Sequence, residues 1–170
     1  MARAGAGGAA AARASEWGVT RAVVADDRWL DELGVPEALS GAGLEVVRWP
    51  TGRDWRELLG LEGPAWTCGV TVPAWAVAER GTLALEAGAT HGRSIDVACS
   101  HHLAVLPAGR IVGTLAEGLA LSFRAGHPPA SAVSLVTGPS RTSDIEKIST
   151  LGAHGALAEH VLIVEDARSS

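Results

Sequence analysis

The chain has 170 residues and a formal net charge of −5, and 47% of its residues are hydrophobic. This length and apolar content suffice for one domain with a buried core. The few basic residues are scattered along an acidic chain, so the electrostatic footprint of a nucleic-acid binder is missing. No apolar run approaches the roughly 18 residues needed to span a bilayer. We therefore expect a cytoplasmic protein that has neither nucleic acid nor a membrane as its partner.

The composition also limits which side chains build the core or hold a cofactor. With one Phe and no Tyr, we expect the six Trp residues to fill core space and helix edges and not to form a partner surface. Cys68 and Cys99 lack the paired spacing of zinc or iron–sulfur sites, so we expect no cofactor in this chain. Two buried, reduced thiols are the favoured interpretation, and the sequence leaves a disulfide open.

The first half of the chain alternates between short apolar runs and helical spacing. Residues 1–18 are rich in Ala and Gly, and we predict a disordered or frayed segment there, with part of a helix as the alternative, followed by a single domain over residues 19–166. Within it we predict strands at residues 22–25, 44–49 and 67–71, and helices at residues 29–39, broken by Pro36, and 54–59. This alternation predicts an α/β fold with a mostly parallel sheet and flanking helices.

The second half continues the pattern. We predict a turn and a strand within residues 77–86, an amphipathic helix at residues 115–124, and further strands at residues 95–98, 102–106, 133–136 and 160–165. Because neighbouring residues of a strand point to opposite faces, His101 and His102 cannot bind one ion, and we predict no metal site.

Glu79 precedes Gly81 at the start of a predicted strand. A carboxylate beside a glycine can act as a nucleophile or general base where the backbone must let a ligand approach closely. Such a Glu can also do no more than accept hydrogen bonds from neighbouring N–H groups. The sequence leaves both interpretations open.

The stretch 133–148 (VSLVTGPSRTSDIEKI) predicts a strand, a tight loop and a helix that begins near Ser143. Ser143 and Glu146 have the spacing of a capping box. A helix N-terminus with Ser140, Arg141 and Thr142 as donors suits a carboxylate or phosphate. The alternative is an exposed turn in which Arg141 pairs with a nearby carboxylate.

Several of these segments together resemble the LUD domain, the family of lactate-utilisation protein C (LutC/YkgG). The similar segments are residues 138–146 (GPSRTSDIE), 151–155 (LGAHG), 78–83 (AERGTL) and 106–112 (LPAGRIV), so that the resemblance covers residues 70–164. The chain departs from the family pattern at five positions, namely Ala74, Arg80, Ser149, Thr150 and Ala156.

The resemblance implies a fold like that of the NagB/RpiA/CoA-transferase superfamily. It also implies a role in the oxidation of L-lactate to pyruvate, as a non-redox subunit or accessory factor whose partner proteins carry the iron–sulfur clusters. We expect a small carboxylate or phosphate ligand in a pocket formed by Gly81, Thr82, Gly138, Ser140, Arg141, Thr142 and His154. Two alternatives stay open, namely a stand-alone enzyme of this superfamily that uses Glu79 and a non-catalytic ligand-sensing or scaffold protein.

Overall fold

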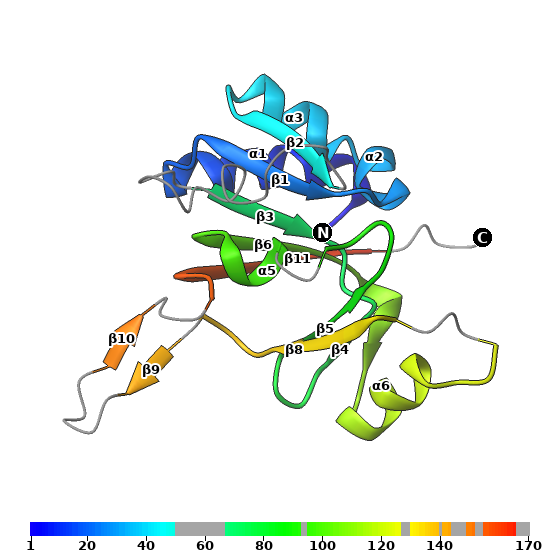
Figure 1. Ribbon diagram of the computed structural model, residues 1–170. Coiled ribbons are helices and arrows are strands. Elements are labelled where there is room, and N and C mark those ends of the chain that lie inside the picture. The colour runs from blue at the N-terminus through cyan, green and yellow to red at the C-terminus, as the bar shows by residue number, and fades with distance from the viewer. Residues whose placement is uncertain are drawn as a thin grey trace.

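Five parallel strands form the central sheet of the structure, a computed structural model that describes residues 1–49, 67–92, 95–126, 130–139, 141–143, 149–151 and 155–165. In their spatial order they are β11 (Ala158–Val164), β6 (His101–Pro107), β3 (Thr67–Thr71), β1 (Arg21–Ala25) and β2 (Glu45–Trp49) (Figure 1). The three inner strands are buried along almost their whole length, as in a sheet that is covered on both faces. The expected α/β fold with a mostly parallel sheet is confirmed.

The order of the strands reverses at β1. β2 lies on one side of β1, whereas β3, β6 and β11 follow one another on the other side. In open sheets with this order, ligands bind outside the carboxyl ends of the strands at the point of reversal. The ends of β1 and β3 are therefore the first place to look for a site.

The N-terminal segment is mostly helical. For residues 1–18, where we predicted disorder or fraying with part of a helix as the alternative, the structure has a short 3₁₀ turn, η1 (Arg3–Gly5), and helix α1 (Ala6–Trp17). Ala6, Ala10 and Ala14 lie on one face of α1 and are fully buried. A Cβ at Gly7 would lie 2.8 Å from the carbonyl oxygen of Gly34, so α1 packs at close range. Small side chains thus hold this helix to the core, although they make it look only weakly apolar in sequence.

The helix predicted over residues 29–39 is divided in two. α2 (Arg28–Glu32) ends before Gly34, which has a φ of +63°, and α3 (Val35–Gly41) then begins with Pro36 in its first turn. Proline suits the first turn of a helix because the N–H groups there have no partner within the helix. The helix predicted at residues 54–59 lies outside the described residues.

A small second sheet and α5 (Ile95–Ala98) cover one face of the parallel sheet. The strands of this small sheet, in spatial order, are β7 (Ile111–Val112), β4 (Trp75–Val77), β5 (Thr82–Ala87) and β8 (Ala132–Val136). His102 of β6 pairs with Gly69 of β3, and a Cβ at Gly69 would lie 2.1 Å from the carbonyl oxygen of Ile95 in α5. Farther along the same face of β6, Ala104 and Leu106 pack against the small sheet. On the opposite face, the ring of Trp17 in α1 lies 4.8 Å from that of His101.

Residues 95–98 were predicted as a strand, and this prediction was wrong. The segment contains β-branched residues, but it forms α5, which lies against the side-chain-free surface of Gly69. Strand propensity reflects packing more than an intrinsic backbone preference. The glycine beneath α5 is therefore what favours a helical turn at this position.

The segment just before the helix predicted near Ser143 forms a strand. Residues Arg141–Ser143 form strand β9, which pairs antiparallel with β10 (Ser149–Leu151), so that Ser143 lies opposite Ser149. Thr142 pairs with Thr150, and Thr is a favourable residue in strands. In Figure 1 this hairpin projects from the lower left of the molecule, away from the parallel sheet. Residues 144–148 lie outside the described part of the chain.

The remaining helix and the aromatic residues agree with the sequence predictions. After the 3₁₀ turn η2 (Ala108–Arg110), α6 (Leu115–Ser122) begins with a capping box between Thr114 and Glu117. Trp75 is fully buried, three other Trp side chains pack at the edge of the core, and Trp55 and Trp66 lie outside the described residues. Both cysteines are buried and free. No helix in the described ranges has the length and apolar character needed to cross a membrane.

Candidate functional site

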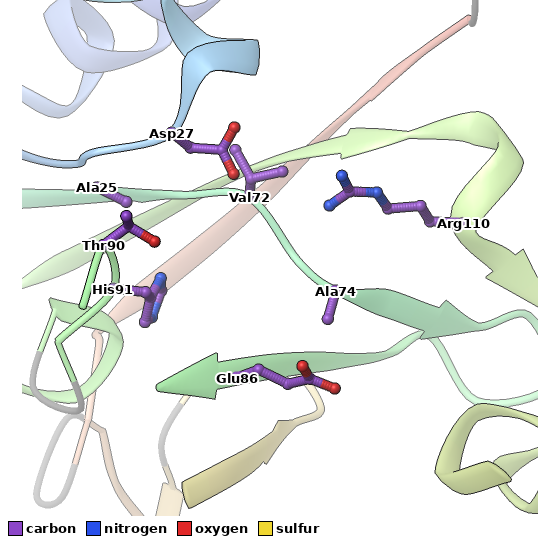
Figure 2. A pocket seen from close by; sticks show the side chains of 8 residues that line it. All are labelled: Ala25, Asp27, Val72, Ala74, Glu86, Thr90, His91 and Arg110. Atoms are coloured by element: carbon purple, nitrogen blue, oxygen red, sulfur yellow. The ribbon is translucent and has the colours of Figure 1, made fainter. Parts of the chain in front are cut away.

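A pocket of about 150 Å³ lies where the carboxyl ends of β1 and β3 meet the small sheet (Figure 2). It is therefore located at the point where the strand order reverses. This volume can hold several water-sized groups, which corresponds to a small organic molecule. The pocket is lined by Ala25, Asp27, Val72, Ala74, Glu86, Thr90, His91 and Arg110.

Backbone contacts hold the loop that carries His91. The N–H of Asp26, just after β1, donates to the carbonyl oxygen of Thr90 at 2.9 Å, and the N–H of Gly88 donates to the carbonyl oxygen of His91 at 2.9 Å. A Cβ at Gly92 would lie 2.3 Å from the ring of Trp49, so this ring of β2 packs directly on the loop. The loop is therefore attached to the ends of both β1 and β2, which places His91 in the pocket.

His91 is only 8% exposed, and its Nε2 atom has no hydrogen-bond partner among the described residues. The pKa of His91 is lowered to about 4, chiefly by burial and to a smaller extent by His102, while Asp27 opposes the change. The imidazole is therefore neutral at pH 7, with one ring nitrogen as a donor and the other as an acceptor. An unpartnered nitrogen of a neutral His in a pocket is suited to bind a polar group of a ligand.

Arg110 supplies the positive charge of the pocket. One of its guanidinium nitrogens, Nη1, donates to the carbonyl oxygen of Pro73 at 2.9 Å, which directs the half-buried side chain across the opening (Figure 2). Within the described ranges, no carboxylate lies within ion-pair distance of this guanidinium. Five other arginines do form such pairs, namely Arg3, Arg13, Arg21, Arg28 and Arg48. Arg110 is thus available to bind an anion.

The two acidic residues of the pocket each have a hydrogen-bond donor from the protein. Asp27 accepts from the N–H of Trp29 at 2.8 Å and caps α2. Glu86, near the end of β5, accepts from the hydroxyl of Ser122 at 2.6 Å, and Ser122 accepts from the indole N–H of Trp75 at 2.7 Å. These contacts fix both carboxylates in place. The pocket therefore combines one cation with several fixed acceptors.

Behind the pocket, a buried polar network crosses three strands. The ring of His102 is hydrogen-bonded through Nε2 to the hydroxyl of Thr71 at 2.8 Å and through Nδ1 to Glu159 at 3.0 Å. Asp96 of α5 is 4% exposed, and neither of its carboxylate oxygens has a partner in the described structure. Burial raises the pKa of the Asp96 carboxyl, so the neutral form is favoured.

The structure brings together some of the residues predicted to form a ligand pocket. The hydroxyls of Thr82 and Thr137 are hydrogen-bonded at 2.8 Å, which places the start of β5 beside Gly138, where φ is +77°. Glu79 and Gly81 lie in the exposed turn between β4 and β5, and neither lines the pocket in Figure 2. This group belongs to the small sheet and not to the carboxyl ends of the parallel strands.

The other predicted residues give less support. Arg141 and Thr142 belong to β9, and the helix on which the anion-binding argument depended would occupy residues 144–148, which lie outside the described residues. Ser140 and His154 lie outside the described residues. The binding role of all these residues stays a prediction.

Our sequence reasoning missed Asp27, Glu86, His91 and Arg110 as site residues. Two signals were available. Asp27 follows the first predicted strand almost directly, and Arg110 lies in a segment, residues 106–112, that we had matched to the LUD domain. Because we expected β1 and β3 to belong to one parallel sheet, the loops at their carboxyl ends should have been examined first. Nothing in the local sequence of His91 marks it as a pocket residue.

Comparisons with known proteins agree with this fold. The model of the family described as "LUD domain" matches residues 9–164. YkgG of Escherichia coli, described as uncharacterised, is 32% identical over 154 residues, which cover 89% of this chain and 65% of that protein. Lactate utilization protein C 1 of Bacillus mycoides is 28% identical over 155 residues, and lactate utilization protein C of Halalkalibacterium halodurans is 26% identical over 154, each again covering 89% of this chain and 65% of the relative. The chain thus spans somewhat less than two thirds of the length of these relatives.

One solved structure also matches. It is the crystal structure of a DUF162 family protein from Deinococcus radiodurans, with a TM-score of 0.51 and 21% sequence identity. The match covers 98% of this chain and 99% of that one. At this level of identity the likeness shows the fold alone.

Proposed function

This chain belongs to the LUD domain family, and from that premise we propose that it acts in lactate utilisation, as a non-redox subunit or accessory factor in the oxidation of L-lactate to pyruvate. The names of the relatives from Bacillus mycoides and Halalkalibacterium halodurans support this role. Iron–sulfur partner proteins would carry out the electron transfer. Both cysteines of this chain are buried, free and far apart in sequence, which fits a subunit without a cluster.

The ligand in this proposal is a small 2-hydroxy carboxylate, bound in the pocket at the ends of β1 and β3. The observation that carries it is Arg110, a half-buried guanidinium that lines the pocket and has no carboxylate partner in the described part of the chain. Guanidinium groups bind carboxylates through two parallel hydrogen bonds. The ligand's carboxylate would form an ion pair with this guanidinium, for which the described residues supply no carboxylate.

The acceptors around Arg110 favour a hydroxy acid over a keto acid. The carboxylates of Asp27 and Glu86 line the same pocket, and an ionised carboxylate can accept hydrogen bonds but cannot donate them. The hydroxyl of L-lactate supplies a donor for one of these acceptors, whereas the keto group of pyruvate supplies none. A hydrogen bond to a charged group contributes about 1.5–3 kcal/mol, so we expect L-lactate to bind about tenfold more tightly than pyruvate.

Isothermal titration calorimetry with L-lactate and pyruvate tests the site. Arg110→Gln should weaken L-lactate binding by about tenfold or more, because it removes a charge-assisted pair. Arg80→Gln is the matched control, since Arg80 is an exposed arginine outside the pocket and should have no effect. Equal binding by wild type and Arg110→Gln would show that the carboxylate binds elsewhere.

Growth on L-lactate as the sole carbon source tests the pathway role. A strain that lacks this gene should grow poorly, and the wild-type gene should restore growth. Failure of a stably folded Arg110→Gln protein to restore growth would connect the pocket to the pathway. Normal growth of the deletion strain, in an organism without a second copy, would contradict the role in lactate utilisation.

A further inference from the structure

A second hollow adjoins the first on the far side of Arg110. Its volume is about 310 Å³, twice that of the first pocket. Ala74, Glu86 and Arg110 line both hollows, so the two are adjoining compartments with three lining residues in common. The residues that line only the second compartment are Trp75, Gly109, Leu121 and Arg124.

The second compartment contains a second arginine without an acidic partner. Arg124 follows the end of α6 and is exposed, and no carboxylate in the described ranges lies within ion-pair distance of it. Of the arginines whose side chains the structure describes, those without an ion pair among the described residues are Arg80, Arg110 and Arg124, and two of these three line this compartment. Two cations at one hollow, neither with a carboxylate partner in the described ranges, favour an anionic ligand in a chain of net charge −5.

The wall between the arginines is held rigidly. The indole N–H of Trp75 donates to Ser122, and Ser122 donates to Glu86, so one hydrogen-bonded series joins β4, α6 and β5. A Cβ at Gly118 would lie 2.3 Å from the ring of Trp75, which shows how closely α6 approaches β4. Leu121 offers a partly exposed apolar surface near Arg124. The second compartment is therefore preformed, with an apolar surface beside a cation.

We propose that the two compartments form one binding site for a ligand with two anionic groups joined by a short apolar spacer. Arg110 binds the first group, a carboxylate, and Arg124 binds the second, a carboxylate or a phosphate. The spacer lies over Leu121. This inference rests on the proposed function, because it uses the same carboxylate site at Arg110, and it extends the ligand class from simple hydroxy acids to acids with a second negative charge.

A chain-length series of dicarboxylates tests the proposal. Malonate, succinate, glutarate and adipate are titrated calorimetrically into the wild-type protein, each beside the monocarboxylate with the same number of carbons, and phosphoglycolate tests a phosphate as the second group. We expect one chain length to bind about tenfold more tightly than its monocarboxylate, because a second charge-assisted pair forms. The ratio of the two affinities is the measured quantity, so a general loss of folding does not imitate the result.

Two arginine variants identify the second contact. Arg124→Gln should reduce the ratio from about ten to near one, whereas Arg80→Gln, which removes an exposed arginine outside both compartments, should leave the ratio near ten. The proposal is overturned if no dicarboxylate exceeds its monocarboxylate, if the advantage survives Arg124→Gln, or if Arg80→Gln removes it equally.

The failure of each proposal can be recognised separately. If L-lactate binds through Arg110 but no dicarboxylate has an advantage, the two-anion site is wrong and the hydroxy-acid site stands. If L-lactate does not bind while a dicarboxylate binds in a manner that needs both Arg110 and Arg124, the hydroxy-acid ligand is wrong and the two-anion site stands.

Discussion

Two groups of buried polar side chains differ in whether their hydrogen-bonding atoms have partners. In the first group, His102 is bonded to Thr71 and Glu159, so both of its ring nitrogens have a partner. In the second group, the Nε2 atom of His91 and both carboxylate oxygens of Asp96 have none among the described residues. Neighbouring parts of one fold thus treat similar chemical groups in opposite ways.

The difference separates architecture from candidate function. A buried polar group with partners contributes to stability or costs little, whereas an unpartnered one costs free energy that the fold must supply elsewhere. The network around His102 joins β3, β6 and β11, and we interpret it as structural. His91 lies in the pocket beside Arg110, and we interpret its open nitrogen as a binding group. Each of the following changes adds or removes a partner and so tests this distinction.

The largest effect is expected from Glu159→Leu. This change leaves the Nδ1 atom of the buried His102 without a partner, and we expect the free energy of unfolding to fall by about 3 kcal/mol. At about 2–4 °C per kcal/mol, the melting temperature should fall by about 10 °C. Glu159→Gln keeps an acceptor and should lose less than half as much. Equal losses in both variants would mean that the hydrogen bond to His102 contributes little.

The stability of the protein should depend on pH through His91. Its pKa is about 4 in the folded protein and about 6.5 in the unfolded chain, so the unfolded state binds more protons between these values. The contribution is fully present above pH 6.5 and is lost as the pH falls toward 4; at about 1.4 kcal/mol per pKa unit, the loss is about 3 kcal/mol. Urea denaturation from pH 7.5 to 4 should show this loss in wild type and not in His91→Gln.

Ala74→Asp supplies Arg110 with a partner. Ala74 lines both compartments beside Arg110, so a carboxylate there would compete with an anionic ligand for the same guanidinium. We expect L-lactate binding to weaken by about tenfold while the melting temperature changes little, because a partly exposed ion pair contributes at most about 1 kcal/mol. Ala74→Asn, a change of the same size without charge, is the control. Unchanged affinity in Ala74→Asp would contradict the assignment of Arg110.

A smaller gain is expected from Asp96→Asn. Burial raises the pKa of this carboxyl above its value in the unfolded chain, so its contribution to stability is complete below pH 3.8 and is lost as the pH rises through the folded pKa. At pH 7 the variant should be more stable than wild type, since the amide carries no charge that burial could penalise. The gain should shrink as the pH approaches 4. A variant less stable than wild type at pH 7 would indicate that Asp96 has a partner that it needs.

The sequence predicted the elements whose signals are local. The strands near residues 22–25, 44–49, 67–71 and 102–106 are short apolar runs bounded by turns, and the structure has β1, β2, β3 and β6 there. The helix near residues 115–124 has an amphipathic pattern and corresponds to α6. Where the prediction was wrong, at residues 95–98, a tertiary contact outweighed the local pattern.

The candidate site could not be read from the sequence, because its residues are brought together only by the order of the strands. Asp27 follows β1, Glu86 lies near the end of β5, His91 lies in the next loop, and Arg110 follows β6. Their proximity depends on the reversal of strand order at β1 and on a small sheet that packs beside it. No spacing along the chain expresses either fact.

The amino-acid sequence by itself determined the α/β class, the mostly parallel sheet and the resemblance to the LUD domain, because periodicity, turn residues and motifs are properties of neighbouring positions. Only the tertiary structure decided which polar groups have partners. Whether Arg110 has a carboxylate beside it, or His91 a hydrogen bond, depends on atoms contributed by distant segments. The open positions that define the pocket are therefore a property of the folded chain.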